Sequence, residues 1–210
     1  VFNDMYAVTV EADLKNDALF LFAYDDIESI QYFGENLKAY WKKDGKTIEI
    51  AMAEAATDYE TILGRCNEFS NKLKTEATLK GGKKYAELLL LSVRQIMAAH
   101  KLVVDNEGNN LFISKECFSN GCAGTVDVTY PSAPIFLLYN TELLKGMLRP
   151  IMKYAAMDEW CCDFAPHDVG QYPLVNGQVY AENRLEYQMP VEECGNMIIL
   201  VSAICKADGN

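Results

Sequence analysis

The sequence has little positive charge and no long hydrophobic run. Its 210 residues contain 19 Lys and Arg against 30 Asp and Glu, which gives a formal net charge of −11. A chain this acidic lacks the basic footprint of a nucleic-acid-binding protein, so we expect no nucleic-acid partner. No apolar run approaches the ~18 residues that a membrane span needs, so we expect no membrane span.

Several common catalytic and cofactor motifs are also missing. The sequence contains no G-x-S-x-G, H-E-x-x-H, P-loop or dinucleotide fingerprint. Its seven cysteines include no C-x-x-C pair, and neither Cys117 with Cys122 nor the adjacent Cys161 and Cys162 has a common zinc spacing. We therefore expect no cofactor and no metal. Most of the cysteines are expected to be buried small hydrophobic side chains, and a disulfide between two of them stays open.

The two ends of the chain indicate a piece of a longer protein. It begins at Val1 rather than Met, without a basic and then apolar leader, so any signal peptide has been removed or lies outside this sequence. At the other end, the apolar segment 197–205 is followed almost at once by the C-terminus. The 50% hydrophobic content nevertheless predicts a globular chain with a sizeable core.

Two regions are predicted to form β-hairpins. Residues 6–24 contain two apolar runs around a polar turn at 13–17, which favours paired strands. Residues 103–113 contain two short apolar runs around a polar loop at 105–110, which predicts a smaller hairpin. We assign residues 1–45 to the end of a β-rich region and its linker.

Helical periodicity dominates after residue 46. Apolar side chains recur every three or four residues over 52–73 and again over 85–103, with a break at Lys80, Gly81 and Gly82. The short link predicts an antiparallel pair of long helices, with His100 on the apolar face of the second. The predicted fold class is mainly α, a partial α/α toroid of helical hairpins over residues 46–210.

Prolines mark the limits of the later elements. Pro131 and Pro134 are expected to bracket a turn, and Asn140 or Thr141 to cap a helix that runs to about residue 156. Pro150 should kink or split that helix. A long irregular loop follows over 163–189, and loops of this length in compact chains are usually functional or disordered. Pro190 then opens a last helix.

Acidic residues gather in this later region. Residues 158–193 hold eight acids against one base, Arg184. Hydrolysis of a neutral bond by activated water needs one carboxylate as base and one acid of raised pKa, which this region can supply. The alternative is a solvated acidic loop followed by two glutamates that a helix dipole favours. The catalytic candidates are Asp127, His167, Asp168, Glu192 and Glu193.

Further polar residues lie where a substrate can be held. Asp127 sits in an apolar, aromatic stretch, where an acid must be hydrogen-bonded, ion-paired or functional. Asp25 and Asp26 follow an apolar run and form either a metal or substrate site or a helix cap. Lys115 beside Glu116 belongs either to the site or to a surface ion pair. The substrate-binding candidates are Asp25, Asp26, Lys115, Tyr130, Tyr172 and Arg184.

Three stretches resemble a known family. They cover residues 22–41, residues 114–134, and residues 164–173 (Phe-Ala-Pro-His-Asp-Val-Gly-Gln-Tyr-Pro) together with 189–197. They are similar to the glutaminase A-like family of large secreted bacterial and fungal proteins. The resemblance implies a six-hairpin, glycosidase-like toroid preceded by β-sandwich domains, an extracellular or periplasmic location, and hydrolysis of L-glutamine to L-glutamate and ammonia. It also implies that this chain is a truncated part of such a protein.

Three hypotheses about function stay open. In the first, Asp168, His167 or Glu193 activates water against the side-chain amide of glutamine. In the second, two carboxylates cut a glycosidic bond, and aromatic side chains such as Tyr180 stack on the sugar. In the third, the chain is a non-catalytic ligand-binding portion, or a fragment that is inactive without the rest of its parent chain. A partial toroid exposes helix faces, which favours contact with that remainder or self-association.

Overall fold

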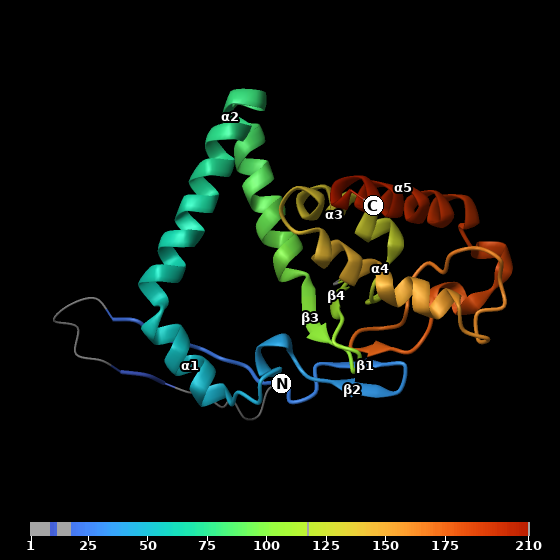
Figure 1. Ribbon diagram of the computed structural model, residues 1–210, viewed down its shortest axis with the longest axis horizontal. Helices are drawn as coiled ribbons and strands as arrows, with labels where there is room; N and C mark the ends of the chain where they lie inside the picture. The colour runs from blue at the N-terminus through green and yellow to red at the C-terminus, as the bar shows by residue number, and fades with distance from the viewer. Residues whose placement is uncertain (1–8, 12–17, 117, 210) are drawn as a thin grey trace, which may run out of the picture.

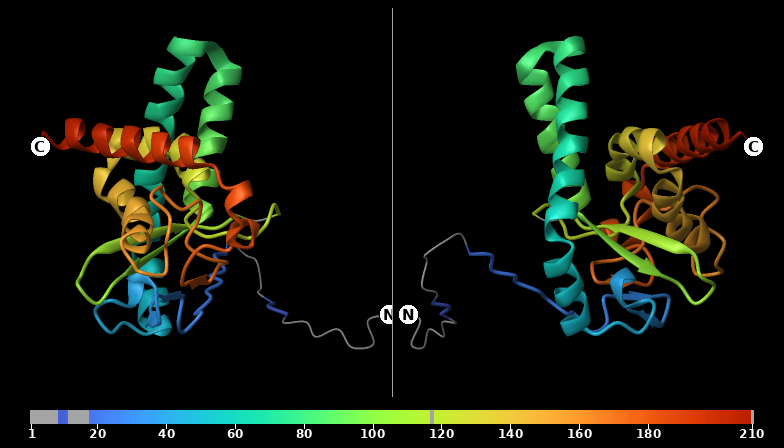
Figure 2. Two further views of the ribbon diagram at one scale, coloured as in Figure 1. Left: turned by 90° about the vertical axis from the view of Figure 1, so that its right-hand side faces the viewer. Right: turned by 60° about the vertical axis from the view of Figure 1, so that its left-hand side comes forward.

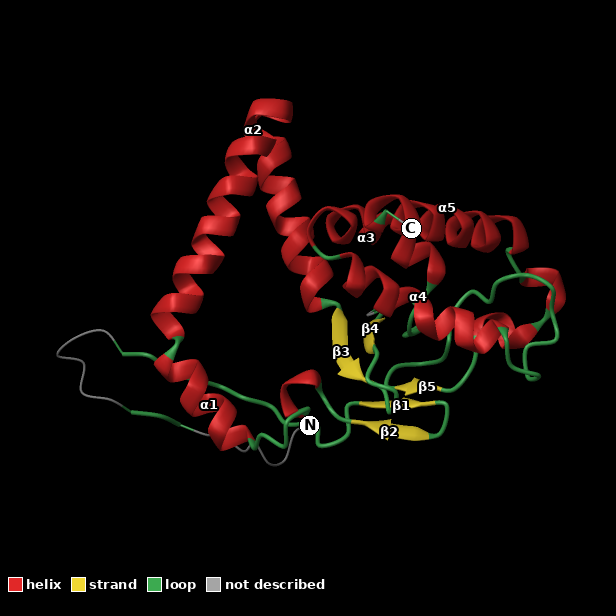
Figure 3. Ribbon diagram, viewed as in Figure 1, coloured by secondary structure: helices red, strands yellow, loops and turns green. Residues whose placement is uncertain are grey.

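The computed structural model describes residues 9–11, 18–116 and 118–209, and it is mainly helical, as predicted. The described elements are shown in Figure 3. In chain order they are β1 (Ile30–Tyr32), β2 (Glu35–Leu37), η1 (Tyr40–Lys42), α1 (Ile48–Thr57), α2 (Tyr59–Ala98), β3 (His100–Val104), β4 (Asn110–Ser114), α3 (Val126–Tyr139), α4 (Thr141–Ala155), β5 (Leu174–Val175), η2 (Tyr180–Asn183), η3 (Leu185–Tyr187) and α5 (Pro190–Asp208).

The predicted helix pair is present with different limits. Gly82 interrupts α2 with φ 81° and ψ 177°, a conformation that suits glycine, and the two arms of α2 meet at the top of Figure 1 and separate downwards. The apolar pattern over residues 52–73 does not form one helix, since α1 ends at Thr57 and α2 begins after Asp58. The helix predicted from the pattern over 85–103 ends before residue 103. His100 and Val103 belong to β3, because that strand pairs with β4.

The smaller of the two predicted hairpins is confirmed and the larger is not. β3 and β4 are antiparallel, and the Asp105 side chain accepts hydrogen bonds from the backbone N–H of Glu107 and Asn109 in the turn. Residues 9–11 and 18–24 are not strands, and the remainder of the predicted 6–24 hairpin lies outside the described residues. The apolar run at 18–24 remains largely exposed because no strand in the described part of the chain pairs with it. The three-stranded sheet is instead ordered β2–β1–β5.

The predicted turn at Pro131 and Pro134 is wrong, because both prolines lie inside α3. Packing outweighs proline's poor helix propensity here: α3 buries Ala133 and Phe136 in a cluster with α4 and α5, and it buries Val126 in a second cluster. α4 begins as predicted, with the Asn140 side chain accepting a hydrogen bond from the N–H of Leu143, and it continues through Pro150 without a split.

Two apolar clusters position the later half of the chain. One joins β1, β3, β4 and α4 to the loop that precedes β5, with Val169 and Val175 fully buried. The other packs α3 against α4 and α5 around Phe112 of β4. Figure 2 shows these three helices gathered on one side of the molecule. The start of α3 and the loop around residue 167 thus share the first cluster through Val126 and Val169, and α5 is held in the second through Leu200 and Ile204.

The prediction that most cysteines are buried is wrong for the described residues. Cys122 is buried, but Cys66, Cys161 and Cys205 are exposed, because no other element covers the helix or loop faces that carry them. The six described cysteines are free thiols. Among the residues that the structure describes, no helix is long and apolar enough to cross a membrane. Closure of a toroid and a domain boundary at residue 45 stay predictions.

Candidate active site

Four of the five catalytic candidates meet around one imidazole ring. Nε2 of His167 lies 3.8 Å from Oδ2 of Asp127 and 3.9 Å from Oε1 of Glu193, and Nδ1 lies 3.5 Å from Oδ2 of Asp168. Asp127 is in the first turn of α3, Glu193 is in the first turn of α5, and His167 and Asp168 lie in the loop between α4 and β5. We call these four side chains the His167 cluster.

Backbone hydrogen bonds fix the loop that carries His167. The carbonyl of His167 accepts from the N–H of Val126 at 2.9 Å, which ties the loop to the start of α3. The N–H of His167 donates to Oε1 of Gln178 at 2.6 Å. Three residues on, Gly170 has φ 144°, and a Cβ there would lie 2.0 Å from the carbonyl oxygen of Leu174. Only glycine fits this close approach without a shift of the chain.

Asp168 is fully buried and well compensated. Its Oδ1 accepts hydrogen bonds from the N–H groups of Gly170 and Val179, and its Oδ2 accepts from the N–H of Tyr180. Such donors stabilise a buried carboxylate.

Burial, with the nearby Asp168 adding to it, raises the pKa of the Cys122 thiol to about 12, so this thiol is not a nucleophile at neutral pH.

Glu193 occupies the opposite kind of environment. It is 1% exposed, and neither carboxyl oxygen has a hydrogen-bond partner. Burial raises the pKa of Glu193 to about 8; His167 opposes this rise, while Asp127, Glu192 and Asp168 add to it. Glu193 is therefore mostly protonated at neutral pH and can donate a proton.

His167 and Asp127 complete the electrostatics of the cluster. His167 is 4% exposed, and burial by itself lowers its pKa, but the carboxyl groups of Asp168, Glu193 and Asp127 outweigh burial and raise it. Asp127 exposes 35% of its side chain, the largest fraction in the cluster. The arrangement places a buried acid, an imidazole of raised pKa and a partly exposed aspartate side chain within one contact shell.

Sequence analysis missed two members of this region. The ring of Tyr180 stacks on the His167 imidazole, with centroids 4.1 Å apart and planes inclined by 11°. Gln178 is 5% exposed and holds the backbone of His167. The sequence indicated Tyr180 only as one of several aromatic side chains that can stack on a sugar. Gln178 and Tyr180 lie eleven and thirteen positions after His167, and no helix or strand joins either of them to it. No spacing rule therefore links them to His167.

The other candidates make contacts elsewhere. Asp25 pairs with Lys42 at 2.7 Å, and Asp26 pairs with Lys101 at 2.5 Å. These ion pairs tie the segment before β1 to η1 and β3, so Asp25 and Asp26 have a structural explanation. Among the residues that the structure covers, no cluster of three His, Cys, Asp or Glu side chains is suited to hold a metal ion.

Five further candidates are exposed or half-buried. Arg184 is exposed, lies 3.3 Å from Glu182 and covers the ring of Tyr187. Lys115 lies over the ring of Tyr172, and Tyr130 and Glu192 are exposed on α3 and α5. The predicted binding roles of these residues stay predictions.

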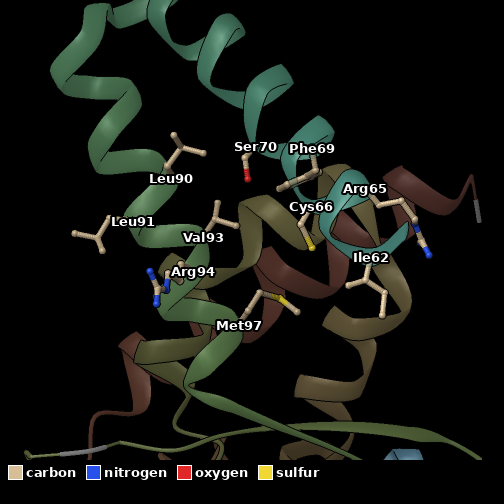
Figure 4. Close-up of a pocket in the computed structure, with 10 residues that line it drawn as sticks. All are labelled: Ile62, Arg65, Cys66, Phe69, Ser70, Leu90, Leu91, Val93, Arg94 and Met97. Carbon is tan, nitrogen blue, oxygen red and sulfur yellow. The ribbon is translucent and has the colours of Figure 1, made fainter. Parts of the chain in front are cut away.

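The cluster is also separate from a large hollow in the helical part. A hollow of about 980 Å³ lies between the two arms of α2, lined mainly by apolar side chains that include Ile62, Phe69, Val93 and Met97 (Figure 4). No residue that lines it belongs to the His167 cluster. The His167 cluster therefore lies at the junction of α3, α5 and the loop, and not in this hollow.

Comparison with known families gives two matches that together cover most of the chain. A model described as the glutaminase A six helical-hairpin domain matches residues 82–210, which is more than half of the chain and includes all four cluster residues. The chain belongs to the glutaminase A six-hairpin family. A second model, for a domain of unknown function (DUF5127), matches residues 3–76. The two matches meet close to the Gly82 break in α2.

Two curated members of the family are fungal. The chain is 33% identical to glutaminase A of Aspergillus oryzae over 181 residues, 83% of this chain and 26% of that protein. It is 35% identical to a probable glutaminase of Arthroderma benhamiae over 135 residues, 64% of this chain and 15% of that protein. The chain thus spans about a quarter or less of each relative. No solved structure is significantly similar to it.

Proposed function

We propose that the protein carrying this chain is a glutaminase-like hydrolase and that the His167 cluster forms its acid–base centre. The observation that carries the proposal is the buried Glu193, whose pKa is raised to about 8, within 3.9 Å of the same imidazole nitrogen that lies 3.8 Å from the partly exposed Asp127. Hydrolysis of an amide needs both an acid for the leaving nitrogen and a base for water, and a buried carboxyl group beside a partly exposed one supports this division of roles.

The proposed reaction uses each group once. Asp127 takes a proton from a water molecule, whose oxygen attacks the side-chain carbonyl carbon of L-glutamine. Glu193 donates its proton to the amide nitrogen as the carbon–nitrogen bond breaks and ammonia leaves. His167 remains a cation between the two carboxyl groups and offsets the negative charge that passes from one to the other. The names of the fungal relatives support L-glutamine as the substrate.

One observation keeps a glycoside as the second candidate substrate. Because both oxygens lie within 3.9 Å of the same nitrogen, those of Asp127 and Glu193 are separated by at most about 8 Å. This upper limit is compatible with the separation of the two carboxyl groups in glycoside hydrolases, about 5 to 9.5 Å. Arg184, which we considered as the partner of a glutamine carboxylate, is paired with Glu182 at the surface. An extracellular or periplasmic location and self-association are further predictions.

An assay of both reactions tests the proposal. The complete gene product that carries this sequence is incubated with L-glutamine and, separately, with a panel of aryl glycosides. We expect ammonia release from glutamine and no glycoside cleavage. Glycoside cleavage without ammonia would contradict the glutaminase proposal and support the second candidate. Inactivity on both substrates would leave the cluster without the proposed function and favour a binding role.

The same chemistry predicts a dependence of stability on pH. Glu193 has an ordinary pKa of 4.5, raised to about 8 in the folded protein, so its contribution is fully present below pH 4.5 and is lost as pH rises towards 8. The raised pKa of His167 acts in the same direction, because protonated His167 also favours the folded state. We expect Glu193→Gln to remove much of this loss and to stabilise the protein at pH 8 by on the order of 2 kcal/mol.

Urea unfolding of wild type and Glu193→Gln at pH 5 and pH 8 measures this effect. The expected result is a midpoint that falls between these pH values in the wild type and falls less in the variant. Parallel pH dependence in the two proteins would show that Glu193 is not a buried acid of raised pKa.

A further inference from the structure

The segment that covers His167 has an unusual backbone. Ala181, Glu182 and Asn183 follow one another with φ of 51°, 53° and 57°. Three successive non-glycine residues in the left-handed region are unfavourable, by about 1 kcal/mol or more for each, and persist only where surrounding contacts hold them. The turn begins directly after Tyr180, whose ring lies on the imidazole of His167.

Two buried side chains supply the contacts that hold this turn. Asp168 accepts hydrogen bonds from the N–H groups of Val179 at 3.0 Å and Tyr180 at 3.1 Å. Gln178 donates through Nε2 to Oδ1 of Asn183 at 2.9 Å, and Nδ2 of Asn183 donates back to the carbonyl oxygen of Gln178 at 3.3 Å. These hydrogen bonds therefore hold the backbone both before and after Tyr180.

The same two side chains also touch His167. Gln178 accepts from the N–H of His167 through Oε1 at 2.6 Å, and Asp168 lies beside Nδ1 at 3.5 Å. Neither the ring of Tyr180 nor Gln178 contributes a charge. Their contacts set where the imidazole plane lies relative to Asp127 on α3 and Glu193 on α5.

From these contacts we infer that Tyr180 and Gln178 are positioning residues, which clamp the imidazole of His167 in the plane that brings Nε2 to both Asp127 and Glu193. The inference rests on the proposed function for its kinetic consequences, but the clamp itself is a statement about geometry. A cluster whose contacts are 3.8 and 3.9 Å long leaves the ring free to turn unless something else holds it. The stacked ring restrains its tilt, and the hydrogen bond to Gln178 restrains its backbone.

Removal of the stacked ring is the first test. In the complete gene product, Tyr180→Leu is expected to lower kcat for ammonia release from L-glutamine about 10- to 100-fold with little change in KM, because misplacement of a catalytic group costs rate more than binding. Tyr180→Phe keeps the ring and should stay within about threefold of wild type. Tyr187→Leu removes a tyrosine of the same loop that packs on Arg184 instead and serves as the matched control.

A second readout does not need activity. Histidine C2 hydrogen–deuterium exchange, followed by mass spectrometry of the peptide that contains His167, gives the pKa of this ring. The groups that face it are Asp127, Asp168 and Glu193, and Tyr180 covers it. In Tyr180→Leu the ring turns away from these carboxyl groups. Their effect outweighs burial in the folded protein, so its loss is expected to lower the raised pKa of His167 towards its ordinary value. Loss of fold stability alone would leave this pKa in the folded protein unchanged.

Asn183→Gly provides a variant that is expected to fold even if Tyr180→Leu does not. Glycine accepts the left-handed backbone, so this change removes only the two side-chain hydrogen bonds to Gln178. We expect the same direction of change, about 3- to 10-fold in kcat. A His167 pKa and a kcat that match wild type in both folded variants would overturn the clamp. If wild type releases no ammonia, the proposed function fails, and the exchange measurement still decides the clamp.

Discussion

Glu193→Gln is expected to reduce kcat for ammonia release by about 10²- to 10⁴-fold, the usual contribution of a general acid. The side-chain amide that replaces the Glu193 carboxyl group in this variant has nearly the same size, but it cannot donate the proton that leaving ammonia requires. Since both oxygens of Glu193 are buried without a hydrogen-bond partner, the replacement breaks no hydrogen bond. Steady-state rates with L-glutamine, taken at pH 6 to 9 on the complete gene product, measure the effect.

Glu192 supplies the comparison for this variant. It is the same residue type in the same turn of α5, but its side chain is exposed. We expect Glu192→Gln to change kcat less than about threefold. Similar losses in both variants would mean that the negative charge at the helix start matters, and not proton donation by Glu193. A larger loss in Glu192→Gln would contradict our assignment of the acid.

Gly170→Ala is expected to destabilise the protein by more than about 3 kcal/mol. At φ 144° the new Cβ would lie 2.0 Å from the carbonyl oxygen of Leu174, an atom of the backbone that cannot move away by itself. Relief of this clash requires the loop to separate from β5, which also removes the Gly170 N–H from Oδ1 of Asp168. Denaturant unfolding should therefore show a lower midpoint, and ammonia release should fall at temperatures where the variant remains folded.

Gly64→Ala is the matched control for this substitution. Gly64 lies in the first arm of α2, and a Cβ built there meets nothing within 4 Å. Alanine in a helix interior is favoured over glycine by up to about 1 kcal/mol, so this variant should be as stable as wild type or more so. Equal midpoints for Gly170→Ala and Gly64→Ala would show that the loop before β5 adapts to the added Cβ. The close approach at Gly170 would then not be needed to hold the loop that carries His167.

The amino-acid sequence by itself determined the elements whose signals are local. The three- and four-residue spacing of apolar side chains fixed the two arms of α2, and Gly82 supplied the break between them. Asn140 and Pro190 marked the first residues of α4 and α5, because a cap or a proline acts within a single turn. The sequence also brought Asp127, His167, Asp168 and Glu193 onto one list of candidates, because Asp127 lies in an apolar stretch and the other three lie in a region with eight acids and one base.

Tertiary structure decided the features that depend on distant partners. α3 forms despite its two prolines because α4 and α5 bury one of its faces, and His100 enters a strand because β4 offers it a partner. The choice between Glu192 and Glu193 depends on which side of α5 meets the loop, which neighbouring positions in a sequence cannot reveal. The placement of Tyr180 over His167 likewise requires the turn that Asp168 and Gln178 close. These contacts join residues without a shared periodicity, so only the folded chain defines them.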